Sequence, residues 1–376
     1  MSNFAKMIEE LSLVDKDSFV VVNAHTEKKE YLSFNSANDA DETPRYLFRV
    51  FTPYSQGTTD THWVKSMAAS HGLLCSEADI FSIENKHRAA DMLNRHLRWQ
   101  PIQGNNLVSW TSSLLFALVY IFHLRASIHN GATLDEIQLL VVDTATFPKG
   151  VFMRDLDLMR AFSSLDQNLR NVEDLRHTKS KWSSSYFYFG EYLSQGALKV
   201  EGRCRMVSAQ NIVDGGLYTI RKEFRDFADW KQEPRSARWA NVVIKTREVF
   251  HYDISQRREM SKRAMKAVLR ISRQFGPDFQ TPIAANLVAI AAPRYRHVPT
   301  QFIYPEHLCL QVPTVFDWKQ FFEEAVRIAA CDTMPEMREY SAIMKGIYEN
   351  YLKATAVAAE KTMFKSVGPI YIMERS

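Results

Sequence analysis

Polar side chains that could do chemistry interrupt three apolar segments of this sequence. They are Arg49 in YLFRVF, Ser109 and Thr111 in LVSWT, and Glu191 in YFYFGEYL. Burying a charge or a hydroxyl costs free energy unless the group is paired or hydrogen-bonded. An arginine, two hydroxyls and a carboxylate in apolar segments therefore indicate either a buried polar cluster or a site that binds a polar ligand.

The first segment, residues 46–51, has the aromatic and β-branched composition of a strand. Because side chains alternate between the two faces of a strand, Arg49 shares its face with Leu47 and Phe51. The residues of the other face are apolar as well, so we expect both faces to be covered. An arginine in such a strand requires an anionic partner.

The second segment, residues 107–111, places Ser109 and Thr111 on one face together with Leu107. Two hydroxyls in the middle of an apolar strand need hydrogen-bond partners. The next residues, 112–127, are apolar and predict a helix. We therefore expect a strand that carries two hydroxyls and leads directly into a helix.

The third segment, residues 186–193, predicts a strand in which Glu191 shares a face with Phe187 and Phe189. Gly190 beside the glutamate is typical of a bulge that re-aims the neighbouring side chain. A lone carboxylate among aromatic rings is either paired or used in a functional site. The simplest structural explanation is a buried ion pair between this carboxylate and Arg49, with the hydroxyls solvating it.

The order of these segments resembles the arginine–serine–glutamate class of ADP-ribosyltransferases. In that family an aromatic–arginine strand comes first, a Ser-Thr-Ser-type strand leading into a helix follows, and a glutamate strand comes last. The matching blocks here are RVF with Arg49, SWTSS with Ser109, and EYL with Glu191. The chain is also similar to an uncharacterised group of fungal proteins that carry the same blocks. The resemblance covers residues 44–210.

This resemblance implies that NAD is the substrate and that its nicotinamide N-glycosidic bond breaks through an oxocarbenium-like state. Glu191 would bind the ribose hydroxyls and stabilise the developing positive charge. Ser109 would orient Glu191 and contact the ribose, while Arg49 would bind a phosphate or the adenosine ribose. The implied activity is mono-ADP-ribosyl transfer to a protein or nucleic acid, or hydrolysis of NAD.

Further NAD contacts are implied for Trp110, Thr111 and Tyr188. A flat nicotinamide ring would stack on an aromatic side chain such as Trp110 or Tyr188, although packing in the core is the commoner role of such residues. Thr111 would support the strand that carries Ser109. The segment His96–Trp99, at the end of a predicted helix, either flanks the site or is a surface helix end. No HExxH or paired-ligand spacing occurs among the eleven histidines, so no metal is expected.

Two departures from the family pattern leave other functions open. Trp110 occupies the middle of the Ser-Thr-Ser pattern, and Phe189 stands where the family often has Gln or Glu. One alternative is a catalytically inactive ADP-ribosyltransferase-like binding or scaffold module. Another is a helical regulatory protein whose N-terminal part has an unrelated α+β fold.

The organisation of the chain predicts an α+β fold in two parts. Residues 1–222 mix strands and helices, and the resemblance implies an ADP-ribosyltransferase-like split β-sandwich with helices. Residues 223–376 have helical periodicity and predict a mainly α-helical C-terminal domain. Candidate strands are residues 19–23, 46–51, 107–111, 137–143, 186–193 and 203–207, and candidate helices are residues 84–99, 112–127, 221–232, 255–275, 317–330 and 335–365.

Positive charge is concentrated in residues 221–273, which contain 15 lysine or arginine residues and 7 aspartate or glutamate residues. Many of these cations fall on the predicted helix 255–275. The helix is either a binding surface for nucleic acid, an acidic protein or an anionic membrane, or a solvated face. The whole chain has a net charge of only +4, which demands no nucleic-acid partner.

Composition excludes several classes of protein. A chain of 376 residues with 46% hydrophobic and 24% charged residues is not a disordered tail, a disulfide miniprotein or a collagen. The motifs GxGxxG and GxxxxGKS/T are missing, so Rossmann and P-loop nucleotide sites are not expected. The four cysteines are scattered, the start has no apolar signal core, and no apolar stretch is long enough to span a bilayer. We expect an intracellular protein, or a secreted effector without a recognisable signal peptide.

Overall fold

The computed structural model describes most of the middle of the chain and parts of its ends. The described residues are 30–35, 43–127, 130–178, 187–228, 238–248, 250, 260–291 and 334–366. The predicted strand 19–23 and the predicted helix 317–330 lie outside these ranges.

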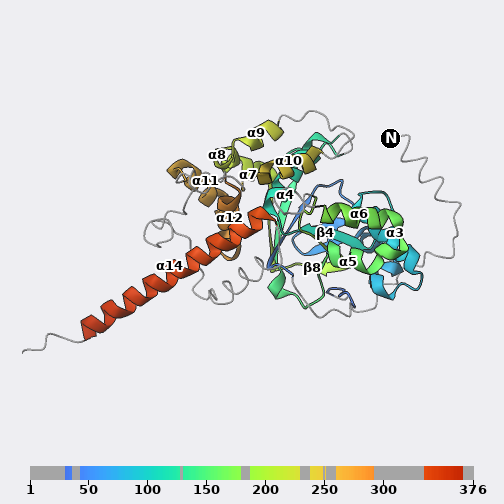
Figure 1. The fold of residues 1–376 in the computed structure, drawn as a ribbon, viewed down its shortest axis with the longest axis horizontal. Helices are drawn as coiled ribbons and strands as arrows, with labels where there is room; N and C mark the ends of the chain where they lie inside the picture. The colour runs from blue at the N-terminus through green and yellow to red at the C-terminus, as the bar shows by residue number, and fades with distance from the viewer. Residues whose placement is uncertain are drawn as a thin grey trace, which may run out of the picture.

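Two antiparallel β-sheets form the centre of the fold (Figure 1). The larger sheet has the strand order β6-β7-β4-β1-β5-β9, and the smaller has the order β2-β3-β8. The strands are β1 Tyr46–Phe51, β2 Thr58–Thr59, β3 Trp63–Lys65, β4 Leu107–Thr111, β5 Gln138–Asp143, β6 Met153–Arg154, β7 Glu191–Gln195, β8 Ala197–Lys199 and β9 Cys204–Ser208. Antiparallel sheets with separate helices confirm the predicted α+β class.

Strand β7 is shorter than the predicted strand over residues 186–193, because it begins at Glu191. Gly190 has a φ of +69°, a left-handed conformation that turns the chain immediately before the strand. The Ser112 backbone N–H donates to the Gly190 carbonyl over 2.9 Å, which fixes this turn beside the end of β4. The predicted extent of the strand was therefore wrong. In place of the expected bulge at Gly190, the structure has a turn directly before the first residue of β7.

Strand β1 is covered on both faces, as its sequence predicts. Leu47 packs in a core cluster with Val64 of β3 and Leu198 of β8, so this cluster joins the two sheets. Phe48, on the opposite face, packs in a second cluster with Leu118 of helix α4. The larger sheet therefore has the small sheet on one side and helices on the other.

Two groups of helices cover the face of the larger sheet that is opposite the small sheet (Figure 1). The first group is α3 Lys86–Leu97, α5 Asp155–Phe162 and α6 Gln167–His177, which pack on β4 and β7. The second is α4 Leu114–Ala126, α7 Ala209–Asp214, α8 Leu217–Ile220, α9 Glu223–Ala228, α10 Arg238–Glu248, α11 Lys262–Arg273, α12 Pro277–Ile290 and α14 Pro335–Ser366. Shorter elements are α2 Met67–Ser70 and the 3₁₀ turns Leu74–Glu77, Ile80–Ser82, Thr144–Thr146 and Ser163–Leu165.

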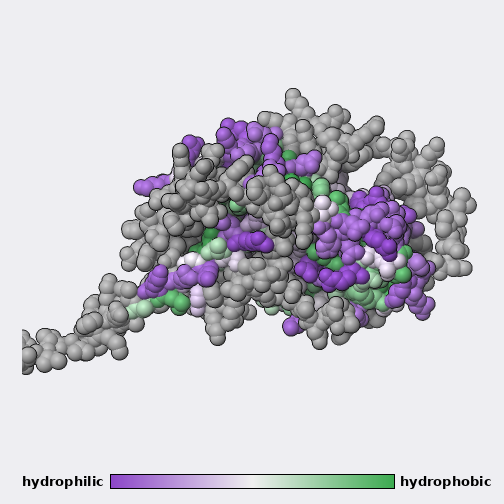
Figure 2. All heavy atoms as spheres, in the orientation of Figure 1, coloured by the Kyte–Doolittle hydropathy of each residue, from purple (hydrophilic) through white to green (hydrophobic). Residues whose placement is uncertain are grey.

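The helical C-terminal part shares its core with the sheet. One apolar cluster contains Phe48 of β1, Leu118 of α4, Val268 of α11 and Met344 of α14. Because the two parts share this core, the domain boundary between residues 1–222 and 223–376 stays a prediction. Helix α14 then leads away from the rest of the molecule, and Leu352 is 46% exposed (Figure 1). The outer surface over α3 and α6 is hydrophilic (Figure 2).

Candidate functional site

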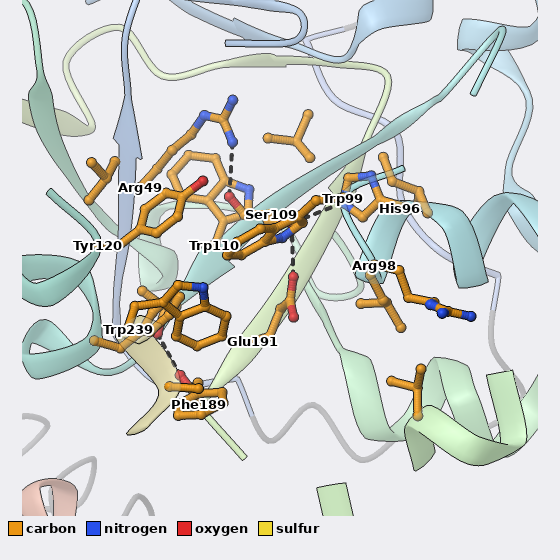
Figure 3. Close-up of a pocket in the computed structure, with 18 of the residues that line it drawn as sticks. Arg49, His96, Arg98, Trp99, Ser109, Trp110, Tyr120, Phe189, Glu191 and Trp239 are labelled. Carbon is orange, nitrogen blue, oxygen red and sulfur yellow. Dashed lines mark hydrogen bonds between the residues drawn. The ribbon is translucent and has the colours of Figure 1, made fainter. Parts of the chain in front are cut away.

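A pocket of about 850 Å³ lies where the two helical groups meet over the larger sheet. Arg49, Ser109 and Glu191 all line it, although they come from β1, β4 and β7 (Figure 3). Its other walls are the end of α3, parts of α4 and α6, and the start of α10. The structure therefore brings together the three residues predicted to be catalytic.

Pairing of β4 with β7 explains why Ser109 and Glu191 meet. Thr111 lies directly opposite Glu191 in the antiparallel ladder, and Ser109 lies two residues farther along on the same face. Such diagonal neighbours are within reach of a long side chain. The Ser109 hydroxyl donates to Glu191 Oε1 over 2.9 Å.

His96 continues this hydrogen-bond chain on the other side of the serine. Its Nε2 lies 2.9 Å from Ser109 Oγ, and its Nδ1 lies 3.0 Å from the Asn105 side-chain nitrogen. The Asn105 oxygen lies 3.2 Å from the same His96 nitrogen and also accepts from the Leu107 backbone N–H. Because Ser109 directs its single proton to Glu191, the contact with His96 requires the proton on Nε2, which leaves Nδ1 as an acceptor for the Asn105 amide group.

Glu191 also shares an arginine with a second carboxylate. Arg176 Nη2 donates to Glu191 Oε2 over 2.9 Å, and Arg176 Nε donates to Asp155 Oδ2 over 3.1 Å. Asp155 is fully buried, whereas the Glu191 side chain keeps 14% of its surface exposed to the pocket. Glu191 is thus paired with Arg176. The ion pair between Arg49 and Glu191 that the sequence suggested does not form.

The environment of this cluster changes the proton affinity of its members. Burial raises the pKa of Glu191 to about 7. The positive charge of Arg176 acts in the opposite direction, but the negative charge of Asp155 partly offsets it. Burial also raises the pKa of Asp155, against the effect of Arg176. The pKa of His96 is lowered by burial to about 4, so His96 is neutral at physiological pH. A carboxyl with a pKa near 7 in a pocket is typical of functional sites.

Arg49 lies at the place where β1 and β4 separate. Only Phe48 and Thr111 are in register between these strands, and beyond that pair Arg49 Nη1 donates to the Ser109 carbonyl over 3.0 Å. Arg49 Nε donates to the Thr59 hydroxyl over 3.2 Å. Among the described residues no carboxylate lies within ion-pair distance of it, and burial lowers its pKa to about 10. Its required anionic partner is therefore not supplied by this part of the chain.

The predicted NAD contacts Trp110, Thr111 and Tyr188 have different surroundings. Trp110 is 2% exposed and packs between the sheets, where its Nε1 donates to Ser194 Oγ over 2.9 Å. Thr111 donates to the Phe189 carbonyl and thereby supports the turn before Glu191. Tyr188 is buried in the core formed with the C-terminal helices. The positions of Trp110 and Tyr188 do not favour the stacking role predicted for them.

Aromatic rings from four segments form the other side of the pocket. Trp99 follows α3, Phe116 and Tyr120 come from α4, Phe189 precedes β7, and Trp239 begins α10. The Trp239 ring lies 4.9 Å from that of Phe189 and 5.2 Å from that of Phe116. The pocket therefore has a polar side, with the carboxylate and guanidinium, and an aromatic side suited to a flat ring.

Several of these residues were missed or left open by sequence reasoning. The segment His96–Trp99 was expected either to flank the site or to end a surface helix, and the structure places it in the pocket wall. Arg176, Asp155 and Trp239 were not predicted. Arg176 and Asp155 lie on helices with many other charges, and no local signal distinguishes them.

The predicted basic helix is observed as α11, with bounds Lys262–Arg273 instead of 255–275. Residues 255–259 lie outside the described ranges. Five cations are exposed on this helix, and no ion pair involving them occurs among the described residues: Lys262, Arg263, Lys266, Arg270 and Arg273. An anionic partner for this face stays a prediction.

Two general properties of the described residues bear on function. No three of their His, Cys, Asp and Glu side chains are grouped so that they could hold a metal ion. Among their helices, none is both long enough and apolar enough to cross a lipid bilayer.

Comparison with known proteins gives one match. A family model described as a domain of unknown function, DUF7587, matches residues 42–200. This range contains Arg49, Ser109 and Glu191 and ends before the C-terminal helices. Neither the search of curated proteins nor the search of solved structures found a significant match.

Proposed function

We propose that this protein binds NAD in the pocket and cleaves its nicotinamide N-glycosidic bond, as a mono-ADP-ribosyltransferase or an NAD glycohydrolase. The observation that carries the proposal is the convergence of Glu191, Ser109 and Arg49 on one pocket. The order of their strands also supports an ADP-ribosyltransferase-like split β-sandwich for residues 1–222.

Glu191 has the surroundings that N-glycosidic cleavage requires. Loss of nicotinamide leaves positive charge on the ribose, and a fixed carboxylate stabilises that charge without reorganising during the reaction. Ser109 and Arg176 hold one Glu191 oxygen each, at 2.9 Å. The carboxylate is therefore fixed in orientation while part of its surface faces the pocket.

Arg49 has the surroundings that a pyrophosphate requires. A half-buried guanidinium without a carboxylate is costly, and a bound phosphate would provide charge-assisted hydrogen bonds. Arg98, exposed at the end of α3, also lines the pocket and would add to the attraction for an anion. The ADP-ribose acceptor is a protein side chain, a nucleic acid or water.

One observation favours a second candidate, a catalytically inactive module that binds a ligand without cleaving it. Arg176 already pairs with Glu191 over 2.9 Å, and this contact competes with the charge that the transition state would need. Such a module would bind NAD or a related anion through Arg49 but release no nicotinamide.

Nicotinamide release from NAD, measured with purified protein, tests the proposal. We expect turnover by the natural chain and a loss of at least about a hundredfold in Glu191→Gln. The matched control is Glu201→Gln, because Glu201 is exposed and outside the pocket lining. Calorimetric NAD binding without turnover would favour the inactive module, and equal turnover by Glu191→Gln would exclude catalysis by this carboxylate.

A further inference from the structure

Helix α10 lies beyond the range matched by the family model, yet it forms part of the pocket wall. Trp239, Ala240 and Asn241, in its first turn, all line the pocket. Figure 3 shows the Trp239 ring beside Phe189, with its indole nitrogen turned toward the cavity. The helical C-terminal part therefore contributes directly to the surface that a ligand would contact.

The indole nitrogen of Trp239 is a buried donor without an acceptor. Trp239 is 9% exposed, and its Nε1 has no hydrogen-bond partner among the described residues. Buried donors in folded proteins are nearly always satisfied, and an exception calls for a specific explanation. The Nε1 of Trp110 shows the ordinary situation, because Trp110 is also buried, at 2% exposed, but its Nε1 donates to Ser194.

Trp99 provides a second, independent anomaly beside Trp239. It is the one residue other than glycine with a positive φ in the described chain, at +56°. The position directly after a helix is usually occupied by glycine when the backbone is left-handed. Strained residues of this kind concentrate at binding and catalytic sites. The Trp99 ring lies 5.2 Å from the Trp239 ring and is 45% exposed, so it lies at the pocket mouth.

Helix α10 is held firmly enough to present Trp239 in a fixed position. At its other end Arg247 forms a buried ion pair with Glu336 of α14, at 2.7 Å. Arg247 also donates to the Tyr188 carbonyl, three residues before Glu191. The same helix thus contacts the segment that carries Glu191 and the aromatic side of the pocket.

We propose that α10 supplies one wall of the ligand site and that Trp239 Nε1–H donates a hydrogen bond to an acceptor on the nicotinamide group of the bound dinucleotide. This assignment rests on the proposed function, since it places one end of NAD in the same pocket. The aromatic side takes the flat ring, and Arg49 on the polar side takes the pyrophosphate. Trp239 is a binding residue in this assignment and has no part in proton transfer.

Binding affinity of Trp239→Phe, measured by calorimetry, tests the assignment. The two ligands are a non-hydrolysable carbocyclic analogue of NAD and ADP-ribose, which lacks nicotinamide. Removing one hydrogen bond should weaken binding of the NAD analogue about tenfold and leave ADP-ribose binding unchanged. The matched control is Trp63→Phe, because Trp63 lies in β3 and outside the pocket lining. Thermal unfolding of each variant shows whether its fold is retained.

The outcomes separate the assignment from the function on which it rests. If the natural chain binds neither ligand, the proposed function fails and the assignment fails with it. If the natural chain binds both and Trp239→Phe binds them equally well, the assignment alone fails. An equal loss of affinity for both ligands places the contact elsewhere on the dinucleotide and also overturns it.

Nuclear magnetic resonance of the indole N–H groups gives a second measurement on the natural chain, which does not depend on the folding of a variant at position 239. The NAD analogue should shift the Trp239 indole resonance downfield, and ADP-ribose should not. Resonances are assigned by loss in single variants at the other tryptophans if Trp239→Phe does not fold. An unchanged Trp239 resonance in the presence of saturating analogue would contradict the assignment.

Discussion

Two buried arginines contact residues 187–191, and their charges are balanced differently. Among the described residues, Arg176 of α6 pairs with two carboxylates, Asp155 and Glu191, whereas Arg247 of α10 pairs with one, Glu336. Each arginine also donates to a backbone carbonyl of the segment, at 2.6 Å. The Phe189 ring is close to both, with its centroid 5.7 Å from the Arg176 guanidinium and 5.4 Å from that of Arg247.

The Arg247 cluster is closed and internally matched. Both nitrogens of its fork bond the Glu336 carboxylate over 2.7–3.1 Å, and Ser113 Oγ donates to the same carboxylate over 2.7 Å. The side chains are 6% and 2% exposed. The charges of this arginine and this carboxylate balance, and their hydrogen bonds are made within the protein, so the pair is not available to bind a ligand.

The Arg176 cluster is open and unmatched. Two carboxylates share one guanidinium, and the one that faces the pocket has its pKa raised to about 7 by burial. Charge imbalance of this sort lowers stability in exchange for a carboxylate whose ionisation can respond to a ligand. The comparison teaches that burial is common to both clusters, whereas unequal charge and a carboxyl with a raised pKa distinguish the cluster that faces the pocket.

The largest difference between the clusters should appear in stability. Glu336→Gln leaves Arg247 without a compensating charge and should lower the free energy of unfolding by about 3–5 kcal/mol. Glu191→Gln should change it by less than about 1 kcal/mol, because Asp155 still compensates Arg176. Urea unfolding of the two variants measures both values. Equal losses would remove the distinction between a matched and an unmatched cluster.

Gly190 lies in the segment that both arginines contact, and its substitution should have the next largest effect. A Cβ at this position would contact Ser112 Oγ and lie 2.6 Å from Met334 Cε, and the φ is +69°. We expect Gly190→Ala to lower the free energy of unfolding by about 2–4 kcal/mol from strain and overpacking. Gly202→Ala is the matched control, because Gly202 has a φ of +72° but nothing within 4 Å of the added Cβ. Similar losses in both would show that Ser112 and Met334 do not crowd the added Cβ at Gly190.

The unmatched cluster should also make stability depend on pH. Burial raises the pKa of Glu191 from 4.5 to about 7, so ionisation of this carboxyl is less favourable in the folded chain than in the unfolded chain. The free energy of unfolding should therefore fall as the pH rises from about 4.5 to about 7 and then level off. Urea unfolding across this range measures the fall, which should be smaller in Glu191→Gln. A fall of the same size in that variant would assign it to another group.

The core of the candidate site could be predicted from sequence because its signal is local. A charge or hydroxyl inside an apolar strand is visible in a few residues, and alternation of side chains gives its face. Ser109 was placed on the face of Leu107 and Glu191 on the face of Phe189, and the pairing of β4 with β7 brings the two polar residues together. Arg49 was expected to need an anion, and the described residues supply none.

The rest of the site could not be predicted because its signal depends on tertiary packing. Arg176 is on a helix with several exposed charges, and its burial depends on tertiary contacts with Asp155 of α5 and Glu191 of β7. Trp239 lies 48 residues after Glu191, and no sequence pattern connects the two. The aromatic run before Glu191 has the composition of a strand, but the left-handed Gly190 ends that pattern, which is why the strand was predicted too long.

His96 should have the smallest effect, because it acts on Glu191 only through Ser109. His96→Phe removes the hydrogen bond that directs the Ser109 proton to Glu191, while Arg176 still holds the other carboxylate oxygen. We expect nicotinamide release to slow about tenfold, the effect of one hydrogen bond. Since the pKa of His96 is lowered to about 4, the pH profile of the variant should keep its shape between pH 5 and 8.

A double-mutant cycle distinguishes positioning by His96 from general support of the fold. If His96 acts by orienting the hydroxyl, His96→Phe should have no further effect on the rate in a Ser109→Ala background. The control is His87→Phe, because His87 is exposed and contacts the Leu165 carbonyl away from the pocket. A full tenfold loss in the Ser109→Ala background would mean that His96 reaches Glu191 by another route. The hydrogen-bond network around Glu191 would then include contacts beyond the chain of Asn105, His96, Ser109 and Glu191.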